Sequence, residues 1–180
     1  PKNSLNNVIR MPDASDTPQI VNGKLAKWED APWLVSLMQR SDQNKNTVKH
    51  FCGGTIISNG WVLTAGHCVY HEESCNDGQR TYRLYTKDEI LLGVYNRSIF
   101  YELVEDPIPY LGYDPNQQGL NPDLALLHFK PSVPIDQRIQ LPLFAGSYQD
   151  SAQGTIWGWG LDENGSVGST LHNLNVDIVK

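Results

Sequence analysis

The run GWVLTAGHC at residues 60–68 constrains this chain more than any other feature of its sequence. It places His67 directly after an apolar segment with strand character, and Cys68 follows at once. A histidine held firmly by its surroundings can act as a general base, because the geometry of proton transfer is then fixed before a substrate arrives. None of the serines has the glycine-framed surroundings that an exposed nucleophile needs. The sequence therefore predicts a base that lacks a nucleophile within these 180 residues.

The composition favours an all-β fold. With 15 Gly and 11 Pro in 180 residues, many short elements joined by turns are expected. Asn59-Gly60 predicts a hairpin turn, because this pair tolerates positive φ angles, whereas the polar residues 39–49 predict a loop. Strand-length apolar or alternating segments occur at residues 33–38, 55–57, 61–64, 81–85, 89–93, 99–104, 124–129, 155–160 and 171–179.

The charge pattern argues against two classes of partner. The net charge is −6, and Lys and Arg do not cluster, so we expect no nucleic-acid partner. No apolar run approaches the length of a membrane-spanning helix, so we expect no membrane association.

The beginning of the chain resembles a processed leader. Residues 1–19 are polar and show no apolar period, so we expect a flexible leader or propeptide-like segment from which any targeting signal has been removed. Two glycosylation sequons begin at Asn96 and Asn164. These features favour a secreted, extracellular protein.

Five motifs occur together in a characteristic order: IVNG (20–23), HFCGG (50–54), LTAGHC (63–68), DLALL (123–127) and GWG (158–160). In order and approximate spacing they resemble the trypsin-like (chymotrypsin-fold) serine proteases, from Ile20 to Lys180. The resemblance implies an all-β fold of antiparallel barrels. Residues 20–130 would form a complete first barrel, and residues 131–180 the linker and first strands of a second barrel that is only begun.

The resemblance assigns roles to the residues around the histidine. His67 would be the general base, and Asp123 a buried carboxylate that orients the imidazole. Cys52 and Cys68 would form a disulfide, which in the chain-entropy model stabilises a loop of this size by roughly 3 kcal/mol. The family usually has alanine where this chain has Gly66.

Activation is expected at Ile20. Cleavage before Ile-Val in this family frees an α-ammonium group that orders the site of the zymogen. Gln19 precedes Ile20 here, rather than the Arg or Lys that a trypsin-like activator would need. A different activator, cleavage elsewhere, or a chain that is never activated would each fit this residue.

The expected nucleophile is not in the sequence. The family's serine lies in a GDSGG motif, which is absent, and none of Ser147, Ser151, Ser166 and Ser169 has those flanking residues. We therefore expect the chain to be a fragment that is inactive alone. A C-terminal half or a second chain would carry the serine.

Cys75 supports a competing hypothesis. The odd cysteine count leaves one thiol free or paired outside the chain, and Cys68, His71 and Cys75 could instead ligate zinc. The ligand spacing departs from well-formed zinc motifs, and extracellular cysteines favour disulfides, so we expect neither a metal nor a cofactor. Val94 also stands where the family's calcium loop begins with an acid, which makes a calcium site doubtful.

The function that follows from the resemblance is that of a serine-type endopeptidase, which acts on peptides or proteins and is a target for protein inhibitors. The alternative is a non-catalytic serine-protease homologue that serves as a binding or regulatory module. A metal-binding β domain is a third hypothesis.

Overall fold

The computed structural model describes residues 23–40, 47–73, 80–94, 97–117, 121–131, 152–160 and 170–178. In this part of the chain there are twelve β-strands and two single-turn 3₁₀ helices, so the prediction of an all-β fold is confirmed. No helix in the described ranges is long and apolar enough to cross a membrane.

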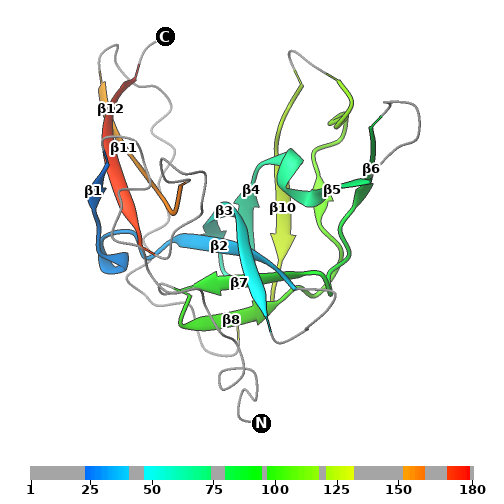
Figure 1. Cartoon of the computed structure of the whole chain (residues 1–180), viewed down its shortest axis with the longest axis horizontal. Helices are drawn as coiled ribbons and strands as arrows, with labels where there is room; N and C mark the ends of the chain where they lie inside the picture. Colours follow the sequence, from blue (N-terminus) through cyan, green and yellow to red (C-terminus); the bar gives the residue numbers. More distant parts are fainter. Residues whose placement is uncertain are drawn as a thin grey trace.

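Seven antiparallel strands form one strongly curled sheet (Figure 1). Across the sheet, the order is β8 (Ile99–Glu102), β7 (Ile90–Val94), β2 (Leu34–Arg40), β3 (Val48–Ser58), β4 (Trp61–Thr64), β10 (Ala125–His128) and β9 (Ile108–Pro109). At one end the curl closes, because Leu103 after β8 forms a bridge with Phe129 after β10. The Val104 N–H also donates to the His128 carbonyl at 2.9 Å.

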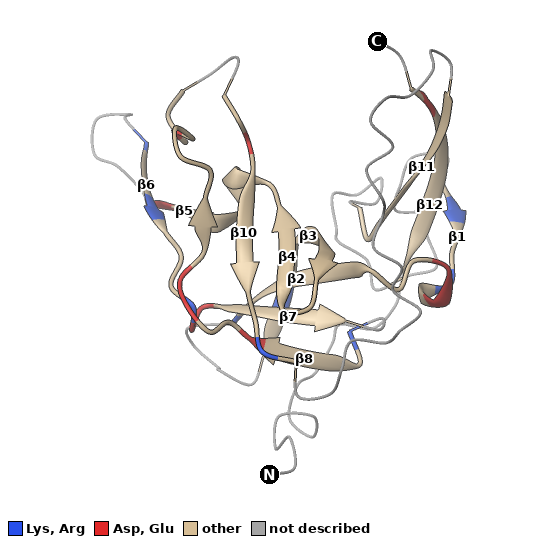
Figure 2. Cartoon of the chain, turned by 180° about the vertical axis from the view of Figure 1, so that it is seen from behind, with Lys and Arg blue, Asp and Glu red and all other residues tan. Residues whose placement is uncertain are grey.

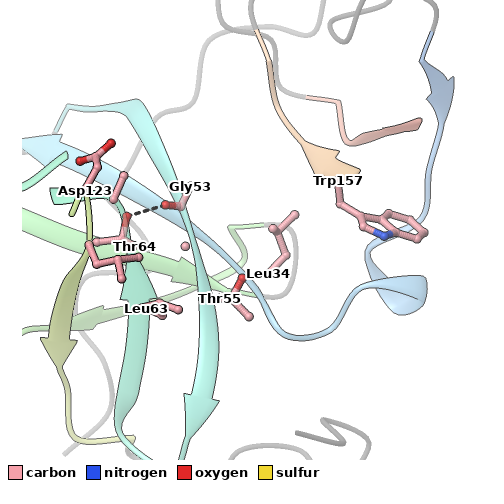
Figure 3. A pocket seen from close by; sticks show the side chains of 10 residues that line it. Leu34, Gly53, Thr55, Leu63, Thr64, Asp123 and Trp157 are labelled. Atoms are coloured by element: carbon pink, nitrogen blue, oxygen red, sulfur yellow. Dashed lines mark hydrogen bonds between the residues drawn. The ribbon is translucent and has the colours of Figure 1, made fainter. Parts of the chain in front are cut away.

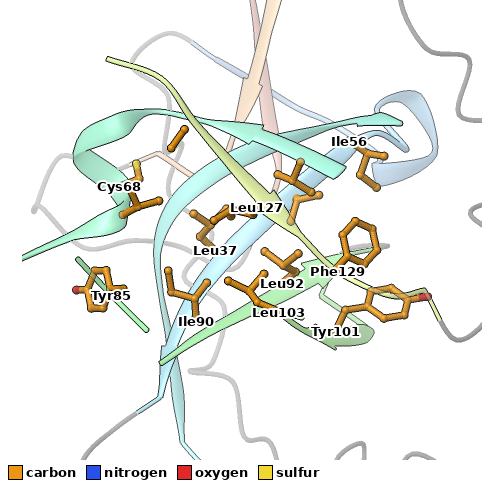
Figure 4. Packing of buried hydrophobic residues seen from close by; sticks show 14 of the residues in the cluster. Leu37, Ile56, Cys68, Tyr85, Ile90, Leu92, Tyr101, Leu103, Leu127 and Phe129 are labelled. Carbon is orange, nitrogen blue, oxygen red and sulfur yellow. The ribbon is translucent and has the colours of Figure 1, made fainter. Parts of the chain in front are cut away.

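One hydrophobic cluster fills the inside of the curl (Figure 4). Alternate side chains of neighbouring strands point into it, and Leu37, Leu92 and Leu127 are completely buried. Burying each such side chain contributes about 1.5–3 kcal/mol. Charged residues lie mainly at strand ends and in connections rather than in the middle of this sheet (Figure 2). The hydrophobic core therefore stabilises the packing of the strands, and polar groups lie at the strand ends.

The predicted hairpin at Asn59-Gly60 is confirmed, and it joins β3 to β4. Of the two turn residues only Gly60 has a positive φ, at +87°. A Cβ atom at Gly60 would lie 2.7 Å from the Phe129 carbonyl oxygen. The Phe129 N–H donates to the Gly60 carbonyl at 2.8 Å, so the turn is held against the chain that follows β10.

The prediction of a loop over residues 39–49 is wrong at both ends. β2 continues to Arg40 and β3 already begins at Val48, with Arg40 paired to Val48. The hairpin extends into polar sequence because Val48 is buried against Met38 and Leu91, in a second small cluster outside the main core.

A second, three-stranded sheet lies to one side of the first (Figure 1). β11 (Ala152–Gly158) pairs with β12 (His172–Ile178), and β1 (Lys24–Leu25) pairs with the other edge of β12. β1 thus falls in the range expected for the first barrel but pairs within the second sheet. The 3₁₀ helix η1 (Trp28–Asp30) leads from β1 towards β2.

A two-stranded ribbon of β5 (Tyr70–Glu73) and β6 (Thr81–Leu84) lies on the opposite side of the curled sheet. β6 matches a predicted strand. β5 was not predicted, because its sequence Tyr-His-Glu-Glu has no apolar alternation.

Candidate active site

Two neighbouring strands bring His67 and Asp123 together. β4 and β10 are antiparallel partners, with Thr64 opposite Ala125. The 3₁₀ helix η2 (Gly66–Val69) follows β4 after one residue and carries His67, and Asp123 lies two residues before β10. Residues separated by 56 positions in the sequence therefore meet at the same end of the sheet.

The carboxylate of Asp123 contacts both the ring and the backbone of His67. The ring Nδ1 lies 2.8 Å from Oδ2, and the His67 N–H donates to Oδ1 at 2.7 Å. A carboxylate is an acceptor, so Nδ1 is the protonated nitrogen and Nε2 is left to take a proton. The His67 side chain is 64% exposed, which makes that nitrogen accessible.

The Asp123 carboxylate keeps its charge. Partial burial acts to raise its pKa, but the hydrogen bonds from the ring and backbone of His67 and from the Gly66 amide outweigh that effect, and the pKa is lowered. The side chain of Asp123, which is expected to be buried in the family's fold, is 44% exposed in this chain. The physical reason is its position at the edge of an open cavity.

That cavity has a volume of about 360 Å³ and lies between the curled sheet and β11 (Figure 3). Its lining is formed by Leu34, Gly53, Gly54, Thr55, Leu63, Thr64, Ala65, Asp123, Leu124 and Trp157. The Thr64 hydroxyl donates to the Gly53 carbonyl at 2.7 Å and so ties β4 to β3 within the wall that the curled sheet forms. The cavity offers space for a ligand or a polypeptide segment beside Asp123.

The expected disulfide is confirmed. Cys52 of β3 and Cys68 of η2 are joined, with their Cα atoms 6.0 Å apart. The bridge attaches the turn that carries His67 to the centre of the curled sheet. Although His67 and the two sulfurs lie within 4.8 Å of one another, the sulfurs are not available to zinc as thiolates while the bridge is intact.

Several predicted site residues lie outside the described residues. They are Ile20, Cys75, Asn96, Asn164 and the serines Ser147, Ser151, Ser166 and Ser169.

Two features of the described residues were not predicted from the sequence. Tyr113 packs against Gly66, and the unusual glycine was the only signal of that contact. His50 of β3 is partly buried, with its Nδ1 2.6 Å from the Ser36 hydroxyl and its ring 5.6 Å from that of Trp159. Burial, and then the positive charge of Arg97, lower the pKa of His50 to about 4, so it is a neutral packing residue at ordinary pH.

Comparison with known proteins agrees with this geometry. The family model described as Trypsin matches residues 20–180. The chain is 32% identical to a trypsin of Phaedon cochleariae, over 95% of the chain and 67% of the relative. Identity to the venom peptide isomerase heavy chain of Agelenopsis aperta is 30%, over 89% of the chain and 63% of the relative.

A third relative, the lectizyme of Glossina austeni, is 28% identical over 89% of the chain and 56% of its own length. The chain thus spans between 56% and 67% of the length of these relatives. Since the family model covers nearly the whole chain, this protein belongs to the trypsin family of serine proteases.

Proposed function

We propose that this chain supplies the general base, His67, and the orienting carboxylate, Asp123, of a serine endopeptidase. The observation that carries the proposal is the double contact of Asp123 with the Nδ1 and the backbone N–H of His67. Two contacts from one carboxylate fix both the tautomer and the position of the ring, which is what a general base requires.

The chemistry is acyl transfer. Nε2 of His67 removes the proton from a serine hydroxyl as that oxygen attacks the peptide carbonyl, and the imidazolium then gives the proton to the leaving amine. Water hydrolyses the acyl-enzyme by the same route. Asp123 remains ionised throughout and stabilises the imidazolium, in keeping with its lowered pKa.

The serine comes from a part of the intact protein beyond these residues, either a C-terminal half or a second chain. Two observations support this proposal. The chain spans only part of its relatives' length, and the open cavity beside Asp123 leaves room for a segment that would carry the nucleophile. The 180-residue chain alone is accordingly inactive.

The proposal also includes the location, activation and partners of the intact protein. The intact protein is a secreted zymogen whose new amino terminus is Ile20, and it acts on peptides or proteins and is bound by protein inhibitors. The Cys52–Cys68 bridge supports an oxidising, extracellular setting.

Amidolysis by the intact protein tests this function. Hydrolysis of a panel of peptide p-nitroanilides should fall by at least about 10³-fold in His67→Ala. The matched control is His71→Ala, four residues away on β5, which should retain activity. Undiminished hydrolysis by His67→Ala would refute the role of the base. A folded, processed protein without any amidolysis would instead favour the non-catalytic homologue.

A further inference from the structure

Gly66 lies directly beneath the ring of Tyr113. A Cβ atom at this position would lie 3.0 Å from both Cγ and Cδ2 of Tyr113, and 3.1 Å from Oδ1 of Asp123. The backbone of Gly66 does not have a positive φ, so its conformation does not require glycine. An alanine methyl group would press on the aromatic ring and on the carboxylate together, so these neighbours would have to shift by a few tenths of an ångström.

The ring cannot easily turn away from such a methyl group. The contacting atoms include Cγ, at the base of the ring, so relief would require the backbone of Tyr113 to move. That backbone is fixed by a turn, in which the Tyr113 N–H donates to the Tyr110 carbonyl at 2.9 Å and Gly112 adopts a φ of +100°. The ring also packs against Tyr70, with the centroids 5.6 Å apart.

The loop after Tyr113 is tied to the segment that leads into Asp123. The Asn121 side chain donates to the Asp114 carbonyl at 2.6 Å and accepts from the Asp114 N–H at 3.2 Å. Tyr113 is therefore held by the turn before it and by Asn121 after it, two residues from Asp123. The position of its ring is coupled to both partners of the dyad.

The ring packs beside the stretch of backbone that meets the carboxylate. Asp123 Oδ1 accepts the His67 N–H at 2.7 Å, and the Gly66 amide also hydrogen-bonds to this carboxylate. An aromatic ring packed on Gly66 restricts movement of the backbone that makes these hydrogen bonds.

We propose that Tyr113 is a positioning residue, which holds the Gly66–His67 peptide against Asp123, and that the lack of a side chain at Gly66 lets its ring approach this closely. The inference rests on the proposed function of His67 and Asp123. It adds a residue in a separate loop, Tyr113, that keeps His67 and Asp123 in position relative to each other.

Nuclear magnetic resonance of the 180-residue chain tests the proposal without the need for activity. The readouts are the low-field resonance of the His67 Nδ1 proton and the exchange rates of the Gly66 and His67 amides. Tyr113→Ala should weaken the resonance and raise both rates at least about fivefold, and Gly66→Ala should do the same by displacing the ring. Tyr113→Phe keeps the contacting ring carbons and should match the parent chain.

The double variant Gly66→Ala/Tyr113→Ala is the decisive arm. Both substitutions disturb the same contact, that between Gly66 and the ring of Tyr113. The double variant should therefore show no weaker a resonance and no faster amide exchange than Tyr113→Ala alone. Gly158→Ala is the matched control, because a Cβ there meets nothing within 4 Å, and it should leave both readouts unchanged. Where Tyr113→Ala does not fold, Tyr113→Leu takes its place.

Additive effects of the two substitutions, or an unchanged resonance and unchanged exchange in Tyr113→Ala, would overturn the positioning role. Asp123→Asn separates this failure from that of the proposed function. If Asp123→Asn abolishes the resonance while the Tyr113 variants leave it intact, only the role of Tyr113 fails. If Asp123→Asn has no effect, the dyad itself fails and the positioning role fails with it.

Discussion

A single carboxylate, that of Asp123, holds His67 at two points, the ring Nδ1 at 2.8 Å and the backbone N–H at 2.7 Å. The ring contact selects the tautomer, and the backbone contact fixes the helical turn on which the ring is carried. Orientation of the imidazole thus comes from the junction of β4, η2 and β10.

Replacing Asp123 by asparagine should therefore disable the base while preserving the fold. The amide places a donor where Nδ1–H needs an acceptor, so the imidazole turns to the wrong tautomer, and kcat of the intact protein should fall by about 10⁴-fold. Asp114→Asn, in the exposed loop nearby, is the matched control and should retain kcat. Steady-state kinetics on both variants measure this, and a fall of less than tenfold in Asp123→Asn would contradict it.

Removing the disulfide should destabilise the chain by roughly 3 kcal/mol, because the bridge joins residues 16 positions apart and restricts the unfolded chain. The double substitution Cys52→Ala/Cys68→Ala, followed by urea unfolding, measures the loss as a lower transition midpoint. Reduction of the parent chain with a dithiol should produce a similar shift. An unchanged midpoint in both experiments would show that the bridge does not stabilise the fold.

His50 should make stability depend on pH between about 4 and 6.5. Its pKa is lowered from 6.5 to about 4 by burial and by Arg97, so the unfolded chain binds the proton more tightly. The contribution is fully present above pH 6.5 and is lost as the pH falls to about 4, with a total of roughly 2–3 kcal/mol.

Urea unfolding at several pH values between 4.5 and 6.5 measures this slope. His50→Gln should flatten it. Equal slopes in the parent chain and in His50→Gln would contradict the assignment.

Glu89 should contribute a second, more acidic transition. Hydrogen bonds from Arg83 and Thr86 overcome the effect of burial and lower its pKa from 4.5 to about 2. The stabilisation is present above pH 4.5 and is lost as the pH falls towards 2. Because the side chain is partly exposed, we expect Glu89→Gln to cost only about 1 kcal/mol at neutral pH.

The matched control for Glu89→Gln is Glu102→Gln, which breaks the ion pair between Arg40 and a carboxylate more exposed than that of Glu89. It should cost less than Glu89→Gln, because Glu102 accepts one hydrogen bond from Arg40, whereas Arg83 donates two to Glu89. Thermal unfolding at pH 7 compares the two. A larger loss in Glu102→Gln would contradict the ranking.

Much of the fold could be predicted from local patterns. Apolar runs such as residues 61–64 and 124–129 identified β4 and β10, since a buried strand needs apolar side chains. The two-residue strands β1 and β9 and the polar strand β5 could not be predicted, because tertiary pairing rather than their own sequence keeps them extended. The long β2–β3 hairpin was missed for a related reason, since burial of Val48 depends on contacts with Met38 and Leu91.

The candidate site shows the same division. His67, Asp123 and the Cys52–Cys68 bridge could be inferred from motifs, because in each motif the reactive residue lies within or next to a recognisable apolar strand sequence. The packing of Tyr113 on Gly66 could not, since it depends on how a separate loop folds back over η2. The exposure of Asp123 was also missed, because it depends on the cavity between the two sheets.

Labelling with a fluorophosphonate probe, followed by mass spectrometry, tests the central claim most directly. The account predicts that the intact protein is labelled at a serine beyond these 180 residues, and that His67→Ala abolishes the labelling. The 180-residue chain alone should remain unlabelled. Labelling of Ser147, Ser151, Ser166 or Ser169 in this chain, or labelling of the intact protein that does not depend on His67, would contradict it.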